Sequence, residues 1–207
     1  MVPISILVSG RGSNLEAILD AVDKRYITKG EVKAVISNKP GVGALEVAKK
    51  HKVPGIVIDD HGFPKKSWEY DQKTIAALKS HGVTPSEGLV LLAGYFRIVS
   101  DEFIDQYYHR IMNIHPALLP SFLGLEAQKQ ALEHGAKITG CTVHFAEKTV
   151  DAGPIILQAT VPVREDDTVE TLSVRILREE HRIYPEAVRL FTEGKLKVEG
   201  RRVHIAS

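Results

Sequence analysis

An amide and an imidazole stand two residues apart in the segment 112–120, which reads Met-Asn-Ile-His-Pro-Ala-Leu-Leu-Pro. Residues two apart on an extended chain point to the same face, so Asn113 and His115 are expected to project together. Pro116 has no N–H to offer a strand ladder, which predicts that the strand ends there. Such a pair can hold a carbonyl oxygen as it becomes an oxyanion, and the imidazole can also carry a proton. The segment therefore suggests acyl transfer, with a strand end and a structural histidine as the simpler alternative.

A glycine-rich turn near the N-terminus predicts a second functional feature. The apolar, partly β-branched run 4–9 is typical of a strand covered on both faces of a parallel sheet. It is followed by Gly-Arg-Gly-Ser-Asn at 10–14 and then by apolar residues at helical spacing. Backbone N–H groups in such a turn, together with the positive end of the helix dipole, favour an anion. A phosphate is the expected ligand, and a tight turn without a ligand is the alternative.

Two common nucleotide motifs do not fit this turn. A dinucleotide fingerprint needs glycine or alanine at the position of Leu15. It also needs an acidic residue at the end of the next strand, but residues 37–38 of this chain are Ser-Asn. The turn also lacks the Gly-Lys-Ser/Thr ending of an ATP-type P-loop. The patterns therefore favour a phosphate group over NAD or ATP.

Helical and strand patterns alternate along the rest of the chain. This rhythm predicts an α/β fold with a doubly wound, mostly parallel sheet and a Rossmann-like N-terminal half. The segment 168–193 is expected to be one long or kinked helix, since Pro185 should interrupt it. The predicted helices are 43–51, 68–81, 100–108, 125–134 and 168–193, and the predicted strands are 32–38, 55–59, 88–95, 138–145, 154–163 and 197–205.

The strand predicted at 138–145 has one apolar and one polar face. Cys141 shares its face with Val143 and Phe145, so it is expected in the core, while Thr142 and His144 share the other face. His144 is expected to be a half-exposed structural histidine, with a residue that supports the site from behind as the alternative.

Composition excludes several classes of protein. The 27 lysines and arginines nearly balance the 26 acidic residues, so the formal net charge of +1 gives no indication of nucleic-acid binding. The single cysteine excludes an internal disulfide and fits a cytoplasmic location. No apolar run has the length of a membrane span, and the histidines lack zinc-ligand spacing. We expect neither a membrane nor a metal.

Four stretches, in this order and at these spacings, resemble the phosphoribosylglycinamide formyltransferase family, the folate-dependent glycinamide ribonucleotide transformylases. The resemblance extends over almost the whole chain and implies the formyltransferase fold in a single domain, 1–207. Within it, 1–100 would be the phosphate-binding half and 101–207 the folate-binding and catalytic half. The stretches are 9–15 (Ser-Gly-Arg-Gly-Ser-Asn-Leu), 92–98 (Leu-Ala-Gly-Tyr-Phe-Arg-Ile), 113–120 (Asn-Ile-His-Pro-Ala-Leu-Leu-Pro) and 150–156 (Val-Asp-Ala-Gly-Pro-Ile-Ile), and the family-specific 180–185 reads Glu-His-Arg-Ile-Tyr-Pro.

The resemblance implies transfer of a formyl group from 10-formyltetrahydrofolate to the amine of glycinamide ribonucleotide. The products would be formylglycinamide ribonucleotide and tetrahydrofolate, in de novo purine biosynthesis. The folate would be a co-substrate, no metal would be needed, and the protein would be a monomer or a homodimer with small-molecule partners only.

The resemblance also assigns roles to residues. A basic residue of the loop 65–66 is expected to meet the folate. Lys66 is the preferred one of its two lysines, and a solvated surface lysine is the alternative. Phe96 to Val99 would bind the pterin through backbone contacts and an apolar slot. The catalytic residues would be Asn113, His115 and Asp151; the substrate-binding residues Gly12, Ser13, Asn14 and Glu180; and the folate-binding residues Lys66, Phe96, Arg97, Ile98, Val99 and Asn113.

In the implied mechanism, Asn113 and protonated His115 hold the oxygen of the tetrahedral intermediate. Asp151 keeps His115 charged and relays protons through water, since an opposite charge a few ångströms away favours the charged imidazole. One departure concerns the loop 121–128, which reads Ser-Phe-Leu-Gly-Leu-Glu-Ala-Gln where bacterial members are expected to carry histidines. This loop therefore offers no histidine for an auxiliary role.

Three other functions share part of this pattern. A formyltetrahydrofolate hydrolase would lack the phosphate turn, and a methionyl-tRNA formyltransferase would add a C-terminal RNA-binding domain. A non-catalytic folate or nucleotide binder on the same fold would have little need of all three catalytic residues.

Overall fold

The computed structural model describes residues 1–206 of the chain. The chain forms two compact units, Met1–Asn113 and Ile114–Ser207, and the division falls within strand β5 (Ile111–His115). The single domain predicted from the sequence stays a prediction.

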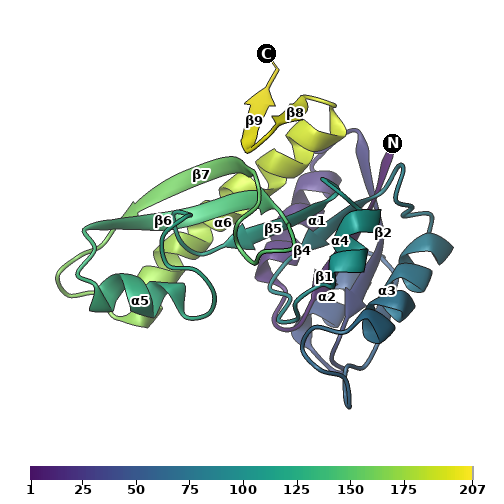
Figure 1. Cartoon of the computed structure of the whole chain (residues 1–207), viewed down its shortest axis with the longest axis horizontal. Coiled ribbons are helices and arrows are strands. Elements are labelled where there is room, and N and C mark those ends of the chain that lie inside the picture. The colour runs from purple at the N-terminus through teal and green to yellow at the C-terminus, as the bar shows by residue number, and fades with distance from the viewer. Residues whose placement is uncertain (207) are drawn as a thin grey trace. The chain divides into compact units, whose positions relative to one another are not determined.

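The first unit is an open parallel sheet with helices in its crossover connections. Its strands lie in the order β3-β2-β1-β4-β5, and every neighbouring pair is parallel. Helix α1 packs against α2, and α3 packs against α4, which confirms the doubly wound, Rossmann-like prediction (Figure 1). The bounds are β1 Val2–Val8, α1 Ser13–Asp23, β2 Gly30–Ser37, α2 Gly43–Lys50, β3 Gly55–Val57, α3 Trp68–Ser80, β4 Leu89–Leu92 and α4 Asp101–Gln106.

The strand order of this unit changes direction between β1 and β4. The chain moves from β1 outward to β2 and β3, then returns to the other side of β1 as β4. Ligands of open α/β sheets bind beyond the carboxyl ends of the strands at such a switch point. The segments that leave β1 and β4 meet there, because the Ser9 N–H donates to the Gly94 carbonyl at 3.0 Å.

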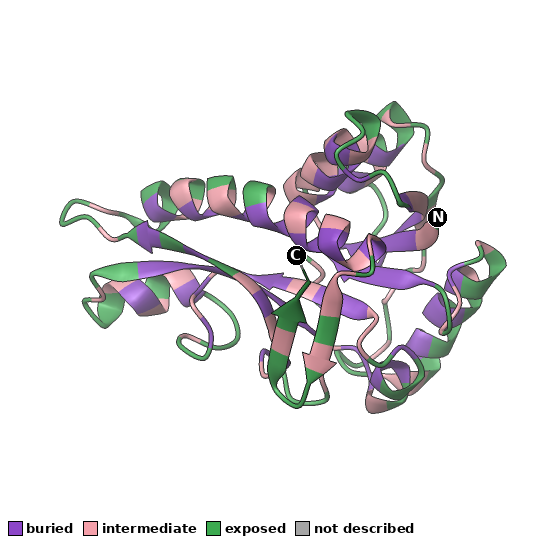
Figure 2. Ribbon diagram, turned by 90° about the horizontal axis from the view of Figure 1, so that it is seen from above, coloured by how far each residue is buried: buried purple, intermediate pink, exposed green. Residues whose placement is uncertain are grey.

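The second unit combines an antiparallel pair, a long helix and a C-terminal hairpin. Helix α6 packs against β6 and β7, as Figure 1 shows. The prediction of a single strand at 197–205 is wrong. The chain turns at Gly200, where φ is 59°, and forms two short antiparallel strands. Neither hairpin strand has a buried residue (Figure 2). The bounds are α5 Ala127–Glu133, β6 Ile138–Phe145, β7 Ile155–Pro162, α6 Val169–Thr192, β8 Leu196–Glu199 and β9 Arg202–Ile205.

Helix α6 continues through Pro185 without a break. The predicted interruption is therefore wrong. A proline inside a helix removes one backbone hydrogen bond, and buried residues on both sides, among them Tyr184 and Val188, hold the two parts on the same packing surface. The helix begins at a capping box, in which Thr168 and Thr171 bond each other's backbone N–H groups.

Cys141 lies in the core of the second unit, as the sequence predicts, with no exposed surface. Burial raises the pKa of its thiol from 9.0 to about 12. Because the thiolate is the reactive form, alkylation by iodoacetamide at pH 8 is expected to be about a thousandfold slower in the folded protein than in urea. Comparable rates in both conditions, followed by mass spectrometry, would mean that the thiol is accessible.

Among residues 1–206, no helix combines the length and the apolar character needed to cross a membrane. In the same residues, no group of three or more histidine, cysteine or acidic side chains is arranged to hold a metal ion.

Candidate active site

The turn after β1 has the backbone geometry of an anion site. Gly12 is the N-cap of α1 with φ 85° and ψ 26°, a left-handed conformation that favours glycine. No side chain caps this helix, so the N–H groups of its first turn have no side-chain acceptor from the cap residue. The turn also packs tightly on α2, because the Ala44 N–H donates to the Gly10 carbonyl at 3.1 Å. Ser13 and Asn14 follow as the first helical residues, where the sequence predicts a phosphate.

Gly12→Ala is expected to lower the free energy of unfolding by about 1–3 kcal/mol. An added Cβ would stand 2.8 Å from both Cα and Cβ of Ala44, and the backbone would stay in a region that alanine avoids. Gly10→Ala is the matched control, since an added Cβ there meets nothing within 4 Å. Equal urea midpoints for the two variants would contradict this account of the turn.

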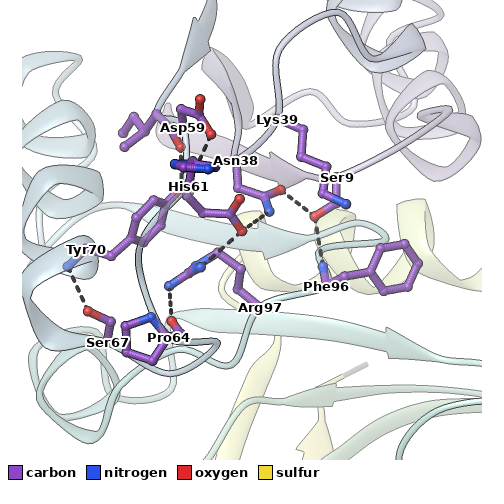
Figure 3. A network of polar contacts seen from close by, with 12 residues as sticks. Ser9, Asn38, Lys39, Asp59, His61, Pro64, Ser67, Tyr70, Phe96 and Arg97 are labelled. Atoms are coloured by element: carbon purple, nitrogen blue, oxygen red, sulfur yellow. Dashed lines mark hydrogen bonds and ion pairs between the residues drawn. The ribbon is translucent and has the colours of Figure 1, made fainter.

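A buried polar network fixes the segment that leaves β4 (Figure 3). The Phe96 N–H donates to Ser9 Oγ at 2.8 Å, and the Ser9 hydroxyl donates to Asn38 Oδ1 at 2.6 Å. Asn38 Nδ2 donates to Asp60 Oδ2 at 2.7 Å, and Arg97 Nη1 donates to the same oxygen at 3.0 Å. Burial raises the pKa of Asp60, but the hydrogen bonds from Asn38 and Arg97 and the charge of Arg97 outweigh it and leave the pKa lowered. The carboxylate is therefore held in its charged form.

The two terminal nitrogens of Arg97 are both bonded within this network. Its Nη2 donates to the Pro64 carbonyl at 2.8 Å, and its guanidinium carbon lies 3.8 Å from the centre of the Tyr70 ring. Only 3% of the side chain is exposed, so the network encloses the guanidinium. Phe96, by contrast, is 58% exposed. This arrangement fits the predicted role of segment 96–99, in which the backbone and an apolar surface meet the ligand.

Lys66 lies beside the same segment. Its backbone forms a parallel bridge with Ile98, and the Ile98 N–H donates to the Lys65 carbonyl at 3.1 Å. The Lys66 ammonium donates to Asp101 Oδ1 at 2.6 Å, in a pair whose side chains are 42% and 49% exposed. An exposed pair of this kind contributes little to stability. The folate contact of Lys66 stays a prediction.

His115 and Asp151 form an imidazole–carboxylate pair in the second unit. His115 Nδ1 lies 3.5 Å from Asp151 Oδ2, and the two side chains are only 5% and 6% exposed. The other ring nitrogen, Nε2, lies 2.8 Å from the Phe122 carbonyl oxygen. A carbonyl can only accept, so Nε2 carries a proton and Nδ1 is left as the nitrogen that gains or loses one.

Backbone geometry positions the Asp151 carboxylate. Asp151 adopts a left-handed conformation with φ 56°, which aspartate tolerates better than most residues. The Gly124 N–H donates to its Oδ2 at 2.9 Å. Gly153 permits the close approach of the following turn to β6, because an added Cβ would collide with the Phe145 carbonyl oxygen.

His144 differs from its prediction, since it is 1% exposed rather than half-exposed. Its Nδ1 donates to the Phe145 carbonyl at 2.9 Å, and its Nε2 lies 3.8 Å from Asp151 Oδ1. Burial lowers the pKa of this imidazole, against the effects of the Phe145 carbonyl and the Asp151 carboxylate. The alternation of side chains on β6 predicts that His144 lies on the polar face of the strand. Only the tertiary structure shows that Asp151 lies beside His144.

Two polar side chains of the antiparallel pair fasten the segment that follows His115. Thr142 on β6 donates to the Ala117 carbonyl at 2.7 Å and accepts from the Leu119 N–H at 3.0 Å. Gln158 on β7 donates to the Leu119 carbonyl and to Thr142 Oγ1, both at 3.0 Å. Neither residue was predicted to support the site, although the position of Thr142 on the polar face of β6 was a signal for it.

Two further predicted residues are placed on regular elements. Asn113 lies on β5 opposite Leu92 of β4 and two residues before His115, so strand alternation gives the two side chains the same face of β5. Glu180 lies on α6 and is 7% exposed, which is unusual for a carboxylate. Its charge contributes to the raised pKa of the Cys141 thiol, after the larger effect of burial.

Comparison with known proteins gives one family and closely similar structures. Residues 2–188 match the family described as formyl transferase. A crystal structure of glycinamide ribonucleotide transformylase 1 from Symbiobacterium toebii superimposes with a TM-score of 0.94 at 51% identity, covering 100% of this chain and 95% of that one. The phosphoribosylglycinamide formyltransferase of Escherichia coli is 40% identical over 195 residues, which are 94% of this chain and 89% of that protein.

Longer relatives also match. The trifunctional purine biosynthetic protein adenosine-3 of Gallus gallus is 43% identical over 197 residues, or 95% of this chain. The chain spans only 19% of the length of that protein.

Proposed function

Because the chain belongs to the formyl transferase family, we propose that it transfers a formyl group from 10-formyltetrahydrofolate to the amine of glycinamide ribonucleotide. The products are formylglycinamide ribonucleotide and tetrahydrofolate, in de novo purine biosynthesis. The proposal is carried by the glycine turn at the start of α1. That turn suits a phosphate-bearing acceptor, which a hydrolase that uses water does not need.

His115 acts as the acid and base of the reaction through Nδ1. The amine attacks the formyl carbon, and the oxygen of the resulting tetrahedral centre becomes negative. The resemblance implies an imidazole that is charged from the start; in this proposal the charge forms during the reaction instead. The His115 imidazole accepts the proton that leaves the amine, directly or through water, and the imidazolium then donates a hydrogen bond to the oxyanion. The Phe122 carbonyl supports this role because it keeps the other proton on Nε2.

Asp151 and Asn113 complete the catalytic set. The Asp151 carboxylate, 3.5 Å from Nδ1, stabilises the imidazolium that forms during the reaction. Asn113 offers a side-chain amide as a second donor to the oxyanion from the same face of β5 as His115. When the tetrahedral centre collapses, N10 of the folate leaves with a proton that His115 supplies.

The remaining predicted residues bind the two substrates. Gly12, Ser13 and Asn14 hold the ribose phosphate at the N-terminus of α1, and Glu180 accepts from the ribose hydroxyls. Backbone groups of 96–99 bind the pterin, with Lys66 at the edge of that segment. The protein works as a monomer or homodimer in the cytoplasm, and 10-formyltetrahydrofolate serves as a co-substrate without a metal.

Product analysis tests this function. Purified protein is incubated with glycinamide ribonucleotide and 10-formyltetrahydrofolate that carries ¹³C in the formyl group, and the ribonucleotide is followed by mass spectrometry. We expect the labelled carbon in the ribonucleotide, in proportion to the tetrahydrofolate formed. Label that appears only as free formate would contradict the proposal and identify a hydrolase.

A further inference from the structure

We infer that Gln130 is a positioning residue for the His115–Asp151 pair, acting through the loop 121–126. This inference rests on the proposed function, because it assigns a role within the same reaction. Both members of the pair are held by backbone groups of this one loop. Phe122 supplies a carbonyl to His115 Nε2, and Gly124 supplies an N–H to Asp151 Oδ2.

The backbone conformation of this loop is not favoured by its own residues. Three of its residues adopt left-handed conformations: Phe122 with φ 53°, Gly124 with φ 78° and Glu126 with φ 58°. Such a conformation disfavours a bulky residue such as phenylalanine. The loop also has little burial to hold it, since Leu123 and Leu125 are 50% and 62% exposed. Its geometry therefore depends on specific hydrogen bonds from outside.

Gln130 supplies those bonds from helix α5. Its Nε2 donates to the Leu123 carbonyl at 3.0 Å and to the Leu125 carbonyl at 2.9 Å. These two carbonyls flank Gly124, so the side-chain amide fixes the peptide group that points at Asp151. The rings of Phe122 and His134 form a second contact, with their centres 5.5 Å apart. This contact holds the N-terminal part of the loop against the C-terminal end of α5.

The chemical consequence concerns the tautomer of His115. While the loop is fixed, the Phe122 carbonyl keeps the proton on Nε2 and leaves Nδ1 facing Asp151. If the loop loses its two bonds to Gln130, the carbonyl no longer selects one tautomer, and the carboxylate loses its fixed N–H donor. Substrate binding would persist, but fewer molecules would present the competent pair.

Three variants separate the donor role of Gln130 from its packing. Gln130→Met keeps the length and the helix propensity of the side chain but removes both donors. Gln130→Lys restores donors without the amide. The matched control is Gln128→Met on the same helix, because within residues 1–206 the Gln128 side chain makes no hydrogen bond to the loop.

We expect Gln130→Met to lower kcat about tenfold, within the range for misplacement of catalytic groups by about an ångström, with both KM values changed less than about twofold. Gln130→Lys should recover most of the lost kcat, and Gln128→Met should match the wild type. Wild-type kcat in Gln130→Met, or a loss confined to KM, would overturn the inference.

Long-range ¹H–¹⁵N spectra of the His115 imidazole provide a readout that does not depend on turnover. We expect the Nε2–H tautomer in the wild type and in Gln128→Met, and a mixture of tautomers in Gln130→Met. Identical spectra in all three would overturn the inference. If the wild-type protein transfers no formyl group, the proposed function fails, and the spectra still decide whether Gln130 positions the pair.

Discussion

His115→Ala is expected to lower kcat for formyl transfer by about 10²- to 10⁴-fold, the usual contribution of general acid–base catalysis. The substitution removes Nδ1, which faces Asp151 at 3.5 Å and is the nitrogen free to exchange a proton. It also removes the imidazolium donor to the oxyanion. Steady-state kinetics with both substrates measures the effect.

Measurements of folding and of substrate binding serve as controls for His115→Ala. The residue is 4% exposed, so we also measure the thermal midpoint and the affinity for glycinamide ribonucleotide by calorimetry. We expect the affinity for glycinamide ribonucleotide to stay within about threefold of the wild-type value, because the phosphate site at α1 is untouched. A group that acts mainly in the transition state can be removed without a large loss of substrate binding. A variant that folds, binds and retains more than about a tenth of the wild-type kcat would exclude His115 as the acid–base group.

Asp151→Asn is expected to lower kcat by about 10²- to 10³-fold, the range for loss of one electrostatic contact to the transition state. Asparagine has nearly the same shape, and its amide oxygen can still accept from the Gly124 N–H, so the change is mainly the loss of one negative charge. Without that charge, the imidazolium that forms at His115 is less stable. Pre-steady-state measurement of the chemical step shows the effect even when product release limits the wild type.

Asp166→Asn is the matched control for the charge change. Asp166 is an exposed carboxylate in the same unit of the protein, and we expect its substitution to leave kcat unchanged. If Asp151→Asn had no larger effect than this control, a role for the carboxylate in stabilising the imidazolium would be excluded.

The parts of the fold that the sequence predicts correctly are those set by local pattern. The apolar run of β1 and the glycine turn at Gly12 appear where expected, because an αL turn and a strand buried on both faces both leave a clear local signal. Alternation on β6 likewise places Cys141 in the core. The pairing of His115 with Asp151, which are far apart in the sequence, was implied by the family resemblance rather than by spacing.

The features that the sequence does not predict depend on tertiary contacts. His144 has an ordinary polar-face position on β6, and its burial follows from the turn that carries Asp151. Nothing in the sequence around Arg97 indicates that Asp60 and Tyr70 enclose its guanidinium. The loop holds the catalytic pair through the backbone of Phe122 and Gly124. Because almost every residue type has the same backbone donor and acceptor, these two contacts could not be predicted from the sequence.

The central claim, that this chain transfers formyl groups to glycinamide ribonucleotide, is tested most directly by one spectrophotometric assay. Deformylation of a 10-formylfolate co-substrate is followed by absorbance with the wild-type protein, with and without glycinamide ribonucleotide. We expect turnover only when the ribonucleotide is present. Loss of the formyl group at the same rate without it would contradict the claim and indicate hydrolysis, and no loss in either case would indicate a protein that binds without catalysis.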